Sequence, residues 1–330
     1  MVQMLLKART KLEGLATRLA QGPARSLFSA IRWAIPLLLL GFLWHSLAQI
    51  GWAAVWDARP RALAFYLVPP VVFFLLPLTD LFIYRNLFRT GKLLRFSILL
   101  RKQSLNTLIL DYSGETYFFY WAQRTLGRTT SEVLHTIKDT NILSAGASLV
   151  VVVACALVLA LIGDLRLQAL VSGGIVPLVL GTLVPLALCL GLVAGGRRVT
   201  SLTHRQMGAI FSVFLARSVA FMLLGVLAWW LSGALPSLIE CFEFVTARLI
   251  FSRLPLPNKA LLFASIAIAA AGTLNLSASH IAAVLVITVL LQQTMALVLV
   301  AVPWALERLS RKALLSSLYL SQSDTDVSTL

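Results

Sequence analysis

The 330-residue sequence contains little charge: Asp, Glu, Lys and Arg together make up only 12% of it, whereas 59% of the residues are hydrophobic. About a quarter of the residues of an ordinary soluble domain are charged, so the composition excludes a typical soluble globular protein. It predicts an all-α polytopic membrane protein, because helices satisfy their own backbone hydrogen bonds in an apolar solvent.

Acidic residues are scarcer still, with 13 Asp and Glu against 28 Lys and Arg. In a membrane protein, such an excess of basic residues indicates orientation and contact with anionic lipid. We therefore expect membrane lipids with anionic head groups as partners, and no nucleic acid.

Residues that usually carry metal, redox or hydrolytic chemistry are few and scattered. Cys155, Cys189 and Cys241 have neither disulfide nor metal-ligand spacing, and the four histidines lie far apart. The sequence also lacks a Gly-rich phosphate loop, a His-Glu-x-x-His motif and a Gly-x-Ser-x-Gly elbow. Nucleotide-driven pumping and the common hydrolase mechanisms therefore lack their parts, and we expect neither a metal nor a cofactor.

Apolar runs of membrane-spanning length are abundant. A helix needs about 20 apolar residues to cross the hydrocarbon, and about six runs meet this requirement. They cover Ile31–Ile50, Ala62–Tyr84, Ser144–Ile162, Ile175–Ala194, Met207–Leu231 and Ile281–Trp304.

Two further apolar stretches are interrupted. Residues 97–126 contain Gly114 and charges, and residues 237–275 contain Pro255 and Pro257. Broken backbone at membrane depth is tolerated only where protein or a water-filled cavity covers it. We interpret both stretches as re-entrant helical hairpins.

The distribution of basic residues predicts the orientation. The loop Arg85–Lys102 is rich in Lys and Arg, as are both ends of the chain, whereas the loop Ser232–Glu240 contains neither. Basic loops face the cytoplasm. We therefore expect a plasma (inner) membrane protein with both termini cytoplasmic, a basic amphipathic arm at 1–30 and a polar tail at 311–330.

The two halves of the chain, 31–162 and 163–310, show the same order of segments. A shift of about 148 residues aligns the spans, the hairpins and two helices that begin after Thr129 and Ser277. Because each half has an odd number of spans, the second copy enters the membrane from the opposite side. This pattern predicts an inverted repeat, in which a substrate site lies between discontinuous helices near the midplane.

The tips of the two hairpins carry opposite charges. The first contains the sequence "DYSGE", and the second contains "SRLPLPNK". Charges inside a membrane mark functional sites by default, so we predict a polar site here; a cytoplasmic turn at 111–115 is the alternative. The candidate residues are Asp111, Tyr112, Gly114, Glu115, Arg248, Arg253, Asn258 and Lys259.

Two more groups of polar residues belong to the hypothesis. Arg217 lies near the middle of the fifth predicted span, and Asp80 is a possible partner although its expected depth differs. The helix from Thr129 extends about 34 residues, or roughly 50 Å, which exceeds the hydrocarbon thickness. Its first turns carry His135, Lys138 and Asp139, which lie either in water at the cytoplasmic end or beside Glu115 in the cavity.

The segment "NTLILDYSGETYFFYWAQRTLGRTTSEVL" resembles the flippase-like family, the lysylphosphatidylglycerol synthase transmembrane-region proteins. In that family an Asn, a short loop ending in Gly-Glu, a helix and a long helix follow in this order. The match adds Asn106 to Gly114 and Glu115, and it extends over residues 31–310. The resemblance implies a protein that moves a lipid or lipid-linked head group between leaflets, alone or with a lipid-modifying partner enzyme. We expect no counterpart of the soluble aminoacyltransferase domain of the bifunctional members, because only about 20 polar residues follow the last predicted span.

The leading expectation is thus a lipid translocator and not an enzyme. One alternative is an integral membrane transferase that uses Asp111 or Glu115 as a base on a lipid phosphate. Another is a small-solute or ion carrier with the same architecture.

Overall fold

The computed structural model describes residue 41 and residues 43–89, 93–109, 112–162, 200, 202–252, 259–272 and 274–301. Every regular element among these residues is an α-helix, which confirms the predicted helical class.

Four of the described helices are long and apolar enough to cross a membrane. They are α4 (Leu63–Phe88), α7 (Thr130–Ile162), α10 (His204–Ser232) and the helix Ala278–Ala301. These helices support a membrane-embedded protein. The predicted span Ile31–Ile50 lies mostly outside the described residues, and Ile175–Ala194 lies wholly outside them.

Local capping motifs fix where the long helices begin. At the start of α7, the Glu132 amide donates to the Thr129 hydroxyl, and the Thr129 amide donates to the Glu132 carboxylate, at 3.3 and 3.2 Å. This reciprocal pair is a capping box, and Thr203 makes another at the start of α10. The Ser277 hydroxyl accepts from the His280 amide at the last described helix. The helix starts predicted after Thr129 and Ser277 are confirmed.

Two pairs of short helices lie where the interrupted stretches were predicted. The first pair is α5 (Phe96–Leu108) and α6 (Ser113–Leu126), and the second is α11 (Leu238–Phe251) and α12 (Lys259–Ala271). In the first pair the chain turns before Ser113, where Tyr112 has a positive φ of 72°. Gly114 therefore lies inside the first turn of α6 and not at the break.

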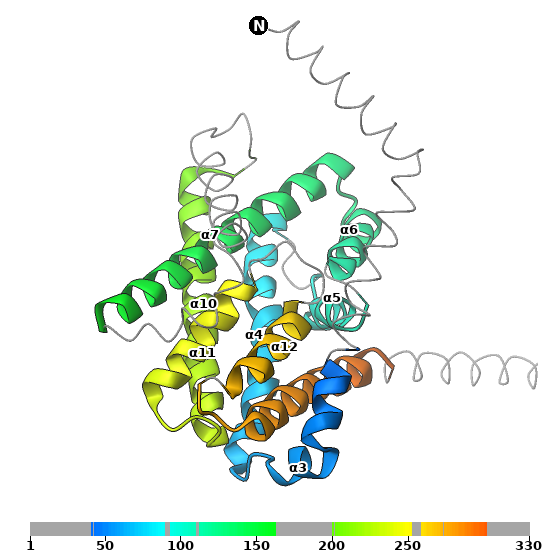
Figure 1. Cartoon of the computed structure of the whole chain (residues 1–330). Helices are drawn as coiled ribbons and strands as arrows, with labels where there is room; N and C mark the ends of the chain where they lie inside the picture. The colour runs from blue at the N-terminus through cyan, green and yellow to red at the C-terminus, as the bar shows by residue number, and fades with distance from the viewer. Residues whose placement is uncertain are drawn as a thin grey trace, which may run out of the picture.

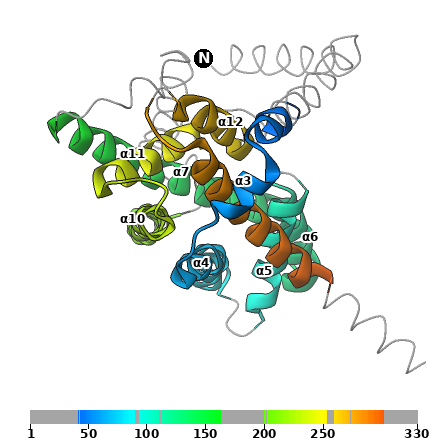
Figure 2. The same ribbon diagram turned by 60° about the horizontal axis from the view of Figure 1, so that its bottom comes forward.

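Helices α4 and α10 are antiparallel neighbours at the centre of the molecule. Near the start of α4, Phe65 shares a buried cluster with Trp229 at the end of α10, and near the end of α4, Ile83 packs in a cluster with Met207 and Phe214. Both helices are seen nearly end-on in Figure 2, whereas α7 crosses them obliquely in Figure 1. These two helices carry Asp80 and Arg217 of the candidate site.

The order of long and short helices occurs twice along the chain. α4, α5–α6 and α7 are followed by α10, α11–α12 and the helix Ala278–Ala301. The last helix passes beside α5 in both views of the ribbon (Figures 1 and 2), and its Gln293 amide donates to the Thr107 carbonyl oxygen at 3.2 Å. The second group of helices therefore contacts the first hairpin near the last turn of α5.

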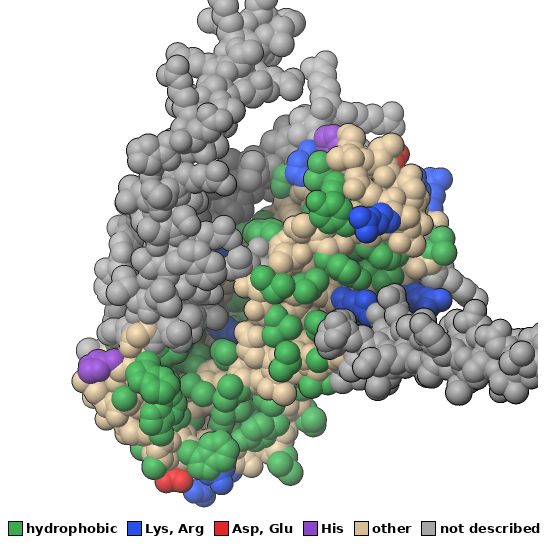
Figure 3. Space-filling model, turned by 90° about the vertical axis from the view of Figure 1, so that its right-hand side faces the viewer, with side chains coloured by type: hydrophobic (Ala, Val, Ile, Leu, Met, Phe, Trp, Pro, Cys, Tyr) green, Lys and Arg blue, Asp and Glu red, His purple; other side chains and the backbone are tan. Residues whose placement is uncertain are grey.

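The surface of the molecule is apolar over a large area. Hydrophobic side chains cover the lower half and middle of the face in Figure 3, and basic side chains gather toward its upper part. On α4, Leu63, Leu67 and Phe82 are 84%, 68% and 59% exposed. Exposed apolar surface of this extent is typical of helices that face lipid.

Candidate functional site

Four charged side chains form a buried network across four helices. The Lys102 amine of α5 lies 2.6 Å from Asp80 Oδ2 of α4 and 3.3 Å from Glu115 Oε1 of α6. Arg217 Nη1 of α10 lies 3.3 Å from Asp80 Oδ1. None of the four side chains is more than 15% exposed. We call Asp80, Lys102, Glu115 and Arg217 the charge network.

Hydroxyl groups surround the arginine at one end of this network. Arg217 Nη2 donates to the Ser144 hydroxyl at 2.7 Å, and Nη1 also contacts the Thr79 hydroxyl at 3.3 Å. The guanidinium stacks 4.5 Å from the centre of the Phe214 ring, which is a cation–π distance. These contacts reduce the cost of holding a cation inside an apolar helix bundle.

Aromatic and hydroxyl groups also connect the network to α7. The Lys102 amine lies 5.4 Å from the centre of the Tyr84 ring. The Tyr84 hydroxyl is 3.2 Å from the Thr140 hydroxyl of α7, and both residues are buried. The polar core therefore extends from α5 through Tyr84 of α4 to α7.

The backbone of the first hairpin brings Glu115 to Lys102. The Gly114 amide donates to Asn106 Oδ1 at 2.6 Å, and the Ser113 hydroxyl donates to the Leu105 carbonyl oxygen at 2.7 Å. A Cβ atom at position 114 would overlap the carbonyl oxygen of Lys102 and come within 2.9 Å of Asn106 Oδ1. Only a glycine lets α6 begin this close to α5, so Asn106 and Gly114 position the network.

The network has no net formal charge, since two carboxylates balance two cations. Among the described residues, however, Glu115 Oε2 and Arg217 Nε are buried and have no hydrogen-bond partner. Such groups are rare in proteins because an unpaired buried polar atom is costly. The site therefore has a spare acceptor at one end and a spare donor at the other.

The sequence-predicted residues separate into those that reach the network and those that do not. Arg217 and Glu115 belong to it, and the suggested pairing of Arg217 with Asp80 is present. Tyr112 is 64% exposed. Arg248 lies in the last turn of α11 and Lys259 is the first residue of α12. Outside the described residues lie Asp111, Arg253 and Asn258.

The opposite charges of the two hairpin tips suggest ion pairs between the hairpins, but Glu115 forms its ion pair elsewhere. Its ion-pair partner is Lys102, which belongs to the same hairpin as Glu115. The sequence pattern places Lys102 in a basic loop, whereas the structure places it on α5 with 6% exposure. The signal that could have found it is helical spacing, because Lys102 shares a face with buried Leu99 and with Asn106.

The polar residues at the start of α7 have different environments. Asp139 is fully buried, accepts a hydrogen bond from the Thr200 hydroxyl, and lies 3.2 Å from the Lys138 amine. His135, one turn earlier, is exposed. This end of α7 is therefore neither uniformly in water nor part of the charge network.

No protein-family model, curated protein sequence or solved structure matches this chain. Within the described part of the chain, no group of three or more His, Cys, Asp and Glu side chains is placed to hold a metal ion. Any assignment of function therefore depends on the charge network and on the sequence.

Proposed function

We propose that this protein translocates, or helps to translocate, a lipid or lipid-linked head group between the leaflets of the membrane. The observation that carries the proposal is the charge network inside an apolar helix bundle. Charges at membrane depth are expensive, and they mark substrate or ion pathways. Arg217 lies near the middle of the 29-residue α10, about 20 Å from its first residue by helical rise.

The lengths of the short helices support re-entrant hairpins. α5 and α6 contain 13 and 14 residues, which correspond to about 20 Å each. The hydrocarbon core is about 30 Å thick, so neither helix crosses it alone. The repeated order of helices supports an inverted repeat, in which α5–α6 and α11–α12 enter from opposite sides and a polar site lies between them.

The charge network suits a polar head group that passes through an apolar barrier. A phosphate would compete with the carboxylates for Lys102 and Arg217, and an amine or hydroxyl group would occupy the spare acceptor of Glu115. The phosphate of a zwitterionic head group would pair with the cations of the network, and its amine would pair with the carboxylates that the phosphate displaces. The resemblance of residues 31–310 to the flippase-like proteins points to the same function.

Glu115→Gln tests this function. The amide keeps the shape of the side chain and removes its charge, and Lys102 keeps its contact with Asp80. We expect translocation of labelled lipid in reconstituted liposomes to fall at least about tenfold, which corresponds to a loss of about 1.4 kcal/mol. The melting temperature in detergent should fall less than that of Asp80→Asn, because Asp80 still contacts both cations. Asp57→Asn, at an exposed position on α3 (Trp52–Asp57), is the matched control and should retain translocation.

Three results would overturn the proposal. A destabilised but fully active Glu115→Gln protein would make this residue a simple helix-capping group in the first turn of α6. Movement of ions or small solutes without movement of lipid would favour the carrier. A covalently modified lipid in the same liposomes would favour the transferase.

The proposed inversion makes a separate prediction about accessibility. Single cysteines at exposed Arg89, after α4, and exposed Leu238, at the start of α11, are expected to react from opposite sides of the membrane. The background would have Cys155, Cys189 and Cys241 replaced by Ala. Labelling of intact vesicles with a membrane-impermeant maleimide provides the measurement. Reaction of both positions from one side would rule out the inverted arrangement.

A further inference from the structure

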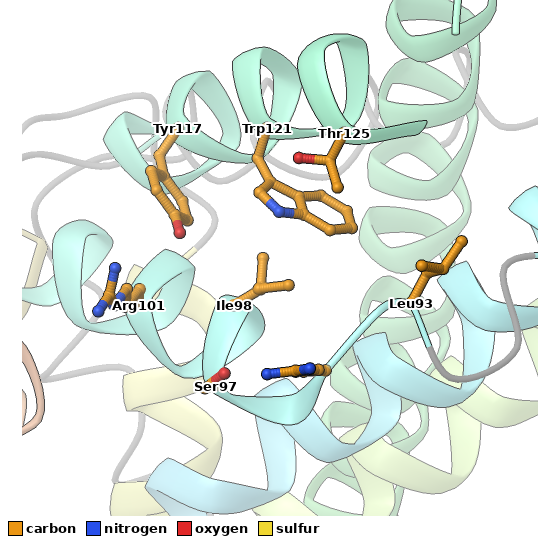
Figure 4. Close-up of a pocket in the computed structure, with 8 residues that line it drawn as sticks. Leu93, Ser97, Ile98, Arg101, Tyr117, Trp121 and Thr125 are labelled. Carbon is orange, nitrogen blue, oxygen red and sulfur yellow. The ribbon is translucent and has the colours of Figure 1, made fainter. Parts of the chain in front are cut away.

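A groove opens on the surface of the first hairpin, away from the charge network. Its volume is about 590 Å³, which lies within the range of ligand pockets in proteins. Its walls are α5, α6 and the segment that precedes α5 (Figure 4). The lining residues are Leu93, Arg95, Ser97, Ile98, Arg101, Tyr117, Trp121 and Thr125.

The walls of the groove combine basic and apolar groups. Tyr117 and Trp121 extend from α6 toward Ile98 and Arg101 on α5 (Figure 4). Arg95 adds a second guanidinium, and the described lining includes no carboxylate. A planar guanidinium binds phosphate through two parallel hydrogen bonds. The groove therefore offers a binding surface for an anion that carries an apolar chain.

The groove lies at the end of α4, at a polar end of the bundle. The Arg85 side chain donates to the Leu94 carbonyl oxygen at 3.0 Å, and Arg128 donates to the Phe88 carbonyl oxygen at 2.9 Å. The first bond ties Leu94 to α4, and the second ties the end of α4 to the turn between α6 and α7. Trp and Tyr side chains concentrate at the membrane–water interface, so Tyr117 and Trp121 fit a position at head-group level.

We infer that this groove is a binding site for an anionic phospholipid, with its phosphate held by Arg95 and Arg101 and an acyl chain lying along Ile98 and Trp121. Arg101 directly precedes Lys102, and successive helical side chains point about 100° apart. Helix α5 therefore presents one basic residue to the groove and the next to the charge network. The inference concerns binding at the interface and does not depend on translocation.

The test compares two double variants with the same loss of charge. Arg95→Gln with Arg101→Gln removes both guanidinium groups from the groove, whereas Arg89→Gln with Arg124→Gln removes two exposed ones outside it. Native mass spectrometry of delipidated protein would measure the affinity for phosphatidylglycerol and phosphatidylcholine. We expect the groove variant to bind phosphatidylglycerol at least about tenfold more weakly and the control to change less than about twofold. Equal losses in the two variants would overturn the inference.

A second variant leaves the arginines intact. Thr125→Trp fills the groove from an exposed position on α6, and it should weaken binding of phosphatidylglycerol without changing the fold. Phosphatidylglycerol with brominated acyl chains should quench the fluorescence of Trp121, measured as the difference from Trp121→Phe. An absence of quenching would contradict the position of the acyl chain.

Two controls distinguish a lipid site from a site for soluble anions and from the charge network. Inorganic phosphate and glycerol phosphate should fail to compete with the lipid; competition at equal concentration would make the groove a site for soluble anions and end the lipid assignment. In Glu115→Gln, brominated phosphatidylglycerol should still quench Trp121, because Glu115 does not line the groove. Loss of translocation in that variant can therefore be distinguished from loss of lipid binding in the groove.

Discussion

Replacing Asp80 by Asn is expected to lower the free energy of unfolding by about 3–5 kcal/mol, the usual cost of removing one partner from a buried ion pair. Asp80 is the one described carboxylate that contacts both Lys102 and Arg217. Its loss leaves two buried cations with only Glu115 to balance them. Chemical or thermal unfolding in detergent provides the measurement, and loss of folded protein during purification is the extreme form of the same result.

Two further variants serve as comparisons for this prediction. Asp57→Asn removes an exposed carboxylate and should change stability by less than about 0.5 kcal/mol. Adding Arg217→Met to Asp80→Asn leaves Lys102 paired with Glu115, so it should recover part of the lost stability. A network with no energetic role would give Asp80→Asn and Asp57→Asn equal stability.

Gly114→Ala is expected to destabilise the first hairpin, because the added methyl group has no space there. The new Cβ would overlap the backbone oxygen of Lys102, which cannot move away as the end of a flexible side chain would. Overpacking of this kind costs about 1–3 kcal/mol. The separation of α6 from α5 would also break the bond between the Gly114 amide and Asn106 and move Glu115 away from Lys102. We therefore expect both stability and lipid translocation to fall.

Gly208→Ala is the matched control, because Gly208 lies in the exposed part of α10 and nothing lies within 4 Å of the position that its new methyl group would take. Alanine favours a helix over glycine by about 1 kcal/mol, so this variant should be as stable as the parent or more stable. Unfolding measurements on the two variants, with translocation measured in parallel, give the comparison. A Gly114→Ala protein with the stability and activity of Gly208→Ala would contradict the close approach of α5 and α6.

The sequence alone determined the helical class, the long apolar helices and several helix ends, because these features depend on neighbouring residues. An apolar run of sufficient length specifies a membrane helix, and the hydroxyl groups of Thr129 and Ser277 bond to amides only three residues away. The broken stretches are predictable for the same reason, since a helix break is a local property. The break itself lies before Ser113 and not at Gly114 as predicted, because Gly114 serves close packing and not the turn.

Only the tertiary structure decided which charges meet. Lys102 and Asp80 are 22 residues apart in sequence, and Arg217 and Asp80 are 137 apart. Their contact depends on the antiparallel packing of α4 with α10 and on the register of α5 against α4. Asp80 and Arg217 meet despite the difference in depth expected from the sequence, because the register of α4 against α10 is not a local property of either helix. Local patterns encode each helix, whereas the partner of a buried charge is set by the packing of helices distant in sequence.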